Sequence, residues 1–144
     1  MNQIPGWIAR GLPLSLALCL LGCGGKPTPE VTPVRGKVTY KGQPLATGTI
    51  VFSPDPFRCR HGRLAWSKIA SDGSYQLQTG EAVGVAAGWY RVTVAAVEVS
   101  APTPHQPYPV PRSLIPDKYR DPQISGLVCE VKAGQENGIN FNLE

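Results

Sequence analysis

The chain has 144 residues, a formal net charge of +4, 42% apolar residues and 17% charged residues. This length fits one domain with short accessory segments, and the apolar fraction argues against a disordered chain. The cations are spread out without a Lys/Arg run, whereas nucleic-acid-binding proteins carry a clustered basic patch. The 16 glycines and 15 prolines disfavour helices, since each proline removes a backbone donor and clashes with the preceding turn.

An apolar run at residues 11–21 follows Arg10, the only charged residue before it. The run is too short to span about 30 Å of hydrocarbon but is typical of a signal-peptide core. It ends in Leu-Leu-Gly-Cys at 20–23, which resembles the bacterial lipobox, whose cysteine thiol accepts a diacylglyceryl group. We therefore predict a lipoprotein signal peptide at 1–22 and lipidation of Cys23. The alternative is an ordinary secretory signal with an incidental cysteine.

The segment 23–33, rich in Gly, Pro and Thr, is predicted to be a lipidated tether. Two or three acyl chains bind a membrane more stably than one chain does. Gly24 stands where the known inner-membrane retention signal has Asp. We expect an exported protein anchored in the cell envelope, at the outer membrane or a periplasmic face rather than retained at the inner membrane.

Most of the chain after residue 33 alternates between apolar and polar side chains, the pattern of strands with one wet face. Asp72 and Gly73 predict a hairpin turn, because this pair tolerates the positive φ of tight turns. In the last segment Ile139, Phe141 and Leu143 are predicted to face inward. Strands are predicted at residues 34–40, 49–52, 64–70, 74–79, 89–99, 127–132 and 139–144.

Seven short strands without a helical pattern predict an all-β fold, an antiparallel Greek-key sandwich. The proline-rich segment 101–125 is predicted to be a loop. It either crosses the sandwich or holds the extended geometry of polyproline.

Four segments carry a family resemblance: GKVTYKGQPL at 36–45, GTIVF at 48–52, DGSY at 72–75 and GWYRVTV at 88–94. The series resembles the carboxypeptidase regulatory-like domain, a transthyretin-like (prealbumin-like) sandwich of bacterial envelope proteins. Residues 113–127 further resemble small bacterial lipoproteins that carry this domain alone. The resemblance implies one such domain over 34–144 and an adhesive, spacer or binding role rather than catalysis.

Cys59 and Cys129 remain after the predicted cleavage, and an oxidising compartment favours their pairing. A bridge would close a loop of about 70 residues, worth ~4 kcal/mol in chain-entropy models. The alternative is that Cys129, which is predicted to face inward, is a lone core thiol.

Two loops are candidate binding surfaces. The first, residues 57–66, combines Phe57 with basic side chains and suits anionic glycans or lipid headgroups. The second, residues 101–122, offers tyrosines beside its prolines. The alternative is that neither loop binds anything. The candidate residues are Arg58, Arg60, Arg63, Trp66, Tyr108 and Tyr119.

Histidine is limited to His61 and His105, and no metal-ligand or nucleophile motif accompanies either residue. We expect no enzyme activity, no cofactor and no metal site. The sequence predicts a non-catalytic, lipid-anchored envelope protein whose sandwich is a structural or protein-interaction module. The expected partners are the membrane and an unknown envelope protein or glycan; the alternative function is a carbohydrate-binding module.

Overall fold

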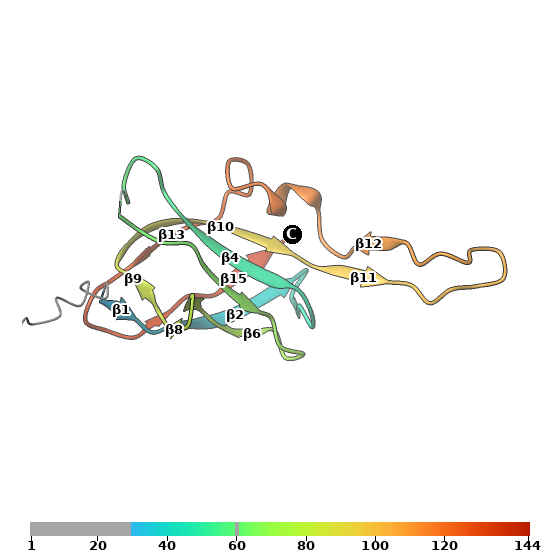
Figure 1. Ribbon diagram of the computed structural model, residues 1–144, viewed down its shortest axis with the longest axis horizontal. Coiled ribbons are helices and arrows are strands. Elements are labelled where there is room, and N and C mark those ends of the chain that lie inside the picture. Colours follow the sequence, from blue (N-terminus) through green and yellow to red (C-terminus); the bar gives the residue numbers. More distant parts are fainter. Residues whose placement is uncertain (1–29, 60) are drawn as a thin grey trace, which may run out of the picture.

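The computed structural model describes residues 30–59 and 61–144 (Figure 1). Strands with alternating apolar and polar side chains form two β-sheets around a shared core. The predicted signal peptide, Cys23 and Arg60 lie outside these residues, so the predictions made for them stay predictions. The all-β prediction is confirmed for the described part. Within it, no helix is long and apolar enough to cross a membrane.

The larger sheet has six strands in the order β13-β10-β4-β5-β7-β8, and every neighbouring pair is antiparallel. Its strands bury one side-chain row and leave the other partly or fully exposed, as the alternation predicts. The strands are β4 (Thr49–Pro54), β5 (Ala65–Lys68), β7 (Gln78–Thr79), β8 (Ala82–Val83), β10 (Gly88–Ala95) and β13 (Val128–Val131).

The second sheet is built on the long strand β2 (Val34–Tyr40), whose inward residues Val34 and Val38 are fully buried. Its antiparallel partners are β3 (Gln43–Pro44) and β6 (Ser74–Gln76). Its parallel partners are β14 (Asn137–Gly138) and β15 (Phe141–Leu143). The fully antiparallel prediction is therefore wrong for the C-terminal strands, although the predicted inward residues Phe141 and Leu143 are buried.

A change of layer explains the parallel pairing. The chain leaves β13 in the larger sheet and turns through residues 132–136 into β14 of the second sheet. Buried Asn137 holds this turn: its Oδ1 accepts from Lys132 N at 2.9 Å, and its Nδ2 donates to the Lys132 and Gln135 carbonyls at 3.0 Å. The chain thus enters the second sheet in the direction of β2.

The predicted strand 74–79 also divides between the layers. Its first half is β6, which pairs with β2, and its second half is β7, which pairs with β5. Fully buried Leu77 lies at the division, and its N–H donates to Val34 O at 2.9 Å. The predicted turn is present: Gly73 has a φ of 81°, and a side chain there would meet Val38 O at 2.7 Å.

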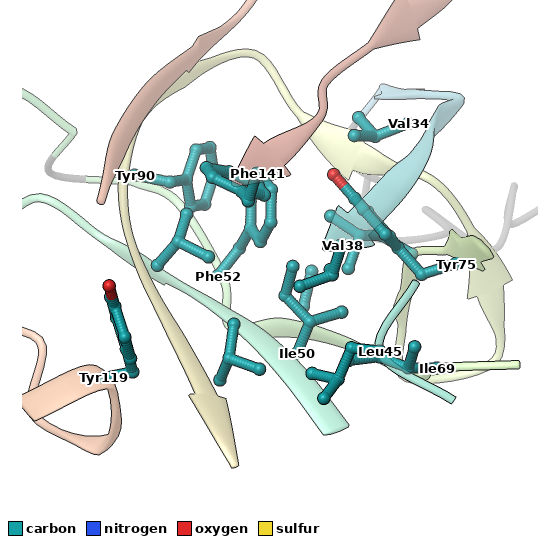
Figure 2. Close-up of a cluster of buried hydrophobic side chains, with 14 of the residues drawn as sticks. Val34, Val38, Leu45, Ile50, Phe52, Ile69, Tyr75, Tyr90, Tyr119 and Phe141 are labelled. Atoms are coloured by element: carbon teal, nitrogen blue, oxygen red, sulfur yellow. The ribbon is translucent and has the colours of Figure 1, made fainter. Parts of the chain in front are cut away.

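An aromatic cluster joins the two layers. Phe52 of the larger sheet lies 6.3 Å from Tyr75 and 5.9 Å from Phe141 of the second sheet, and 6.0 Å from Tyr90 of its own sheet, all between ring centroids (Figure 2). Tilted and edge-on aromatic pairs at such distances each add about 0.5–1.5 kcal/mol beyond area burial. Phe52 is therefore the centre of the core.

The folded region begins before the predicted start at Val34. Residues 31–32, assigned to the tether, form β1 (Val31–Thr32), which pairs with β9 (Val85–Ala86). Thr32 is buried in this pairing.

A two-stranded arm leaves the other end of the molecule (Figure 1). The predicted strand 89–99 stays in the sheet only as far as Ala95, and β11 (Val97–Val99) continues outward to pair with β12 (Pro111–Ser113). The proline-rich segment therefore forms a projecting hairpin, here called the arm (residues 97–113), rather than a crossing of the sandwich. A short 3-10 helix, η1 (Asp117–Arg120), follows the arm and lies against β10.

Candidate functional site

Asp55 organises the loop between β4 and β5, here called the basic loop (residues 56–64). Its Oδ1 accepts from Phe57 N at 3.0 Å and from Arg58 N at 3.1 Å. Its Oδ2 accepts from the Arg58 guanidinium at 3.3 Å and from Arg91 Nε at 3.1 Å. The Asp55 side chain is almost completely buried, so one carboxylate fixes the start of the loop against strand β10.

The ionisation of Asp55 reflects two opposing effects. Burial raises its pKa, but the hydrogen bonds from Arg91, Phe57 and Arg58 outweigh burial and lower the pKa to about 2. Asp55 is not among the site residues predicted from the sequence. Its place between Pro54 and Pro56 is typical of a turn, and no local pattern signals the pairing with Arg91, 36 residues away.

A pocket of about 360 Å³ lies under the basic loop. Two glycines make room for the Cys59 thiol on its wall: a Cβ at Gly62 would lie 2.7 Å from Cys59 Sγ, and one at Gly88, whose φ is 147°, would lie 2.5 Å from it. The lining combines a thiol, an imidazole and a guanidinium with small residues: Arg58, Cys59, His61, Gly62, Ala86, Ala87 and Gly88.

The described basic residues of the loop, Arg58 and Arg63, differ in their contacts. Arg58 pairs with Asp55, and its guanidinium lies 4.3 Å from the ring centre of Trp89, a cation–π arrangement. Arg63 is exposed and forms no ion pair with a described residue. Phe57 is 83% exposed and Leu64 54%.

Trp66 lies apart from the basic loop's pocket, on the outer face of the larger sheet. It belongs to an in-register row across five strands, here called the outer row. Trp66 is 36% exposed, and its neighbours are partly or fully exposed. In order, the row consists of Thr93, Val51, Trp66, Gln78 and Val83.

Tyr108 lies near the tip of the arm and is 80% exposed. Every residue from 97 to 112 is exposed. The tip turns between Thr103 and Gln106, whose N–H groups each donate to the other's carbonyl, at 2.9 Å and 3.0 Å. The arm thus presents apolar side chains, such as Val99 and Val110, to solvent.

Tyr119 is not a surface contact, so its prediction as a binding residue is wrong. Only 4% of it is exposed, and Figure 2 draws it among the buried side chains. Its hydroxyl donates to Glu144 O at 3.1 Å and accepts from Glu144 N at 2.9 Å. Because η1 packs on β10, Tyr119 faces the core and fixes the C-terminal residue.

Cys59 and Cys129 are free thiols in the structure, and no disulfide joins them. Cys129 lies opposite Tyr90 across the β10–β13 pair, whereas Cys59 packs over Gly88, two residues earlier in β10. Burial raises the pKa of Cys129 to about 12, so this thiol stays protonated at neutral pH. Cys129 is thus a half-buried thiol that packs against the core.

No group of three or more metal-ligating side chains comes together within residues 30–59 and 61–144. Comparison with known proteins gives no match: neither a family model, nor a curated protein, nor a solved structure matches this chain.

Proposed function

We propose that this chain is a bacterial lipoprotein in which acylated Cys23 holds a non-catalytic β-sandwich at an envelope membrane. The lipobox-like Leu-Leu-Gly-Cys at 20–23 carries the proposed anchor. The observation that gives the anchored molecule its orientation is the separation of β1 from the arm, which lie at opposite ends of the molecule (Figure 1). β1 begins only eight residues after Cys23. An anchor at Cys23 would therefore hold one end of the sandwich near the bilayer and present the arm away from it.

The arm is the proposed contact with an envelope protein. Its exposed Val99, Tyr108 and Val110 do not pack in the core, and exposed apolar and aromatic groups gathered in one place are typical of interaction surfaces. Alternating prolines at 107, 109 and 111 favour an extended backbone that loses little entropy on binding.

We also propose that residues 34–144 are a carboxypeptidase regulatory-like, transthyretin-like domain. The support is the resemblance of the four segments together with the all-β fold, in which these segments form β2, β3, β4, β6 and β10. The proposed location is the outer membrane or a periplasmic face.

Photocrosslinking in cells tests the contact. A benzophenone amino acid replaces Tyr108 in the arm or, as a control, Val83, an exposed residue of the sandwich body. We expect one discrete adduct with an envelope protein from position 108 and none from position 83. Equal adducts from both positions, or none from either, would contradict a contact through the arm.

The outer row supports a second candidate, a carbohydrate-binding module. Trp66 on the outer sheet face has Val51 and Gln78 beside it on the neighbouring strands, and Thr93 lies one strand beyond Val51. This row combines an apolar platform with polar groups that can orient a ligand. Glycan-array binding that Trp66→Ala abolishes and Tyr108→Ala retains would favour this candidate. If the intact protein binds no glycan on the array, the carbohydrate-binding candidate is excluded for those glycans.

A further inference from the structure

The basic loop has an unusual composition for an exposed segment. Residues 56–64 include three arginines and no carboxylate. Two large apolar side chains, Phe57 and Leu64, stand exposed among the cations. Exposed aromatic and aliphatic groups interleaved with arginine are typical of segments that lie in a membrane interface, where the apolar groups enter the acyl boundary and the cations meet anionic headgroups.

The loop lies at the anchored end of the molecule. It shares a pocket with Ala86, and Ala86 is the strand partner of Val31 in β1. Eight residue steps separate Val31 from Cys23, and a fully extended chain of that length spans at most ~28 Å. A lipid on Cys23 would therefore keep the end of the molecule that carries β1 and the basic loop within reach of the bilayer, whereas the arm leaves from the opposite end (Figure 1).

The start of the loop is also held in place before any contact. Asp55 receives the Phe57 and Arg58 N–H groups and is itself tied to Arg91 of β10. Its charge is balanced by Arg58 and Arg91. The exposed Arg63 is free to meet a phosphate, a group that guanidinium binds in a bidentate manner.

We propose that the basic loop is a membrane-contact surface, in which Phe57 and Leu64 enter the interface of an anionic bilayer and Arg63 binds its phosphates. This inference rests on the proposed lipid anchor. The occupant is the lipid surface rather than a glycan, because the tryptophan platform suited to sugars, around Trp66, lies on the outer face of the larger sheet and not in the basic loop.

The test uses the full mature protein, purified from membranes and reconstituted into vesicles of phosphatidylglycerol and phosphatidylcholine with brominated acyl chains. Phe57→Trp places a reporter in the loop, and Tyr108→Trp places the same reporter in the arm, at residues of similar exposure. After subtraction of the emission of the unsubstituted protein, we expect the lipid to quench about half of the reporter emission or more at 57 and almost none at 108.

Charge is tested in the same vesicles. Adding Arg63→Glu to Phe57→Trp is expected to reduce the quenching, whereas adding Arg63→Lys largely retains it, and vesicles of phosphatidylcholine alone reduce it as well. Hydrogen exchange of the unsubstituted protein gives a second readout, in which amides 56–64 are slower in vesicles than in detergent and amides 101–110 are unchanged.

The outcomes separate this inference from the anchor. Intact mass is measured before reconstitution, and a protein without acyl chains would contradict the proposed function. An acylated protein in which position 57 is not quenched and exchange at 56–64 is unchanged would overturn the membrane-contact surface and leave the anchor standing. Stronger quenching at 108 than at 57 would overturn it too, because the arm would then face the bilayer.

Discussion

The basic loop and the arm both project from the sandwich, at opposite ends, but they are held in different ways (Figure 1). A buried carboxylate ties the loop to β10 through Arg91 and through two backbone N–H groups. The arm is held by the β11–β12 pairing, by the turn at its tip and by local hydrogen bonds, such as the one that Ser100 Oγ donates to Val110 O. Its side chains from 97 to 112 all lie in solvent.

This difference assigns stability to the region around Asp55 and binding to the arm. Substitutions at Asp55 disturb a buried, paired charge, so they are expected to lower the free energy of unfolding. Substitutions in the arm remove side chains that contribute nothing to the core, so they leave folding nearly unchanged. An arm residue that matters in the cell therefore matters through a partner.

Phe52→Ala is expected to give the largest effect, because both projections depend on the core that Phe52 centres. Truncating a buried phenylalanine costs about 3–5 kcal/mol, and three aromatic partners are lost together. Denaturant unfolding followed by near-ultraviolet circular dichroism measures the loss, with Phe52→Leu as a milder control. Equal stability of Phe52→Ala and the unsubstituted protein would contradict the described core.

Asp55→Asn is expected to destabilise the protein less than Phe52→Ala but clearly more than any arm substitution. The amide keeps the size of the side chain but loses the charge that pairs with Arg58 and Arg91. The control is Asp117→Asn, since Asp117 is exposed and only distantly paired with Arg120, at 3.7 Å. Similar stability of the two variants would mean that Asp55 does not hold the loop.

The pH dependence of stability tests the same contribution of Asp55. Because the folded pKa of Asp55 is about 2 and an unfolded aspartate titrates near ~3.9, its contribution is present above about pH 4 and is lost as the pH falls through 2. The free energy of unfolding, measured at successive pH values, should depend less steeply on pH between these limits in Asp55→Asn than in the unsubstituted protein. An unchanged pH dependence in that variant would assign the acid sensitivity to other carboxylates.

Tyr108→Ala is expected to have the smallest effect on folding, within about 0.5 kcal/mol. The same substitution should weaken capture of the envelope partner when a photocrosslinker is placed at Val99, the paired neighbour of Pro111 in the arm. Val83→Ala is the matched control, because Val83 is exposed on the sandwich body. A large loss of stability in Tyr108→Ala would show that the arm packs on the sandwich.

The positions of the strands can be predicted from the sequence better than which strands pair with one another. Alternation identifies β2 and the buried Phe141 and Leu143, because burial of one face depends on local periodicity. The parallel pairing of β15 with β2 depends on the turn at Asn137, whose hydrogen bonds form only after the chain has crossed between sheets. Leu77 likewise divides one predicted strand between two layers, and no local signal marks that division.

The candidate site shows the same limit. Composition identifies the basic loop, since Phe57, Arg58 and Arg63 are neighbours in sequence. Asp55 is recognised only when Arg91 is brought beside it by the β4–β10 pairing. The prediction for Tyr119 failed because a tyrosine in a proline-rich segment was expected to be exposed, whereas η1 turns it into the core.

The most direct test of the proposed anchor is the intact mass of the protein purified from its native membrane fraction. We predict a chain that begins at Cys23 and carries the additional mass of two or three acyl groups. A soluble product that is cleaved elsewhere and carries no acyl mass would contradict the anchor, and with it the orientation that presents the arm away from the membrane.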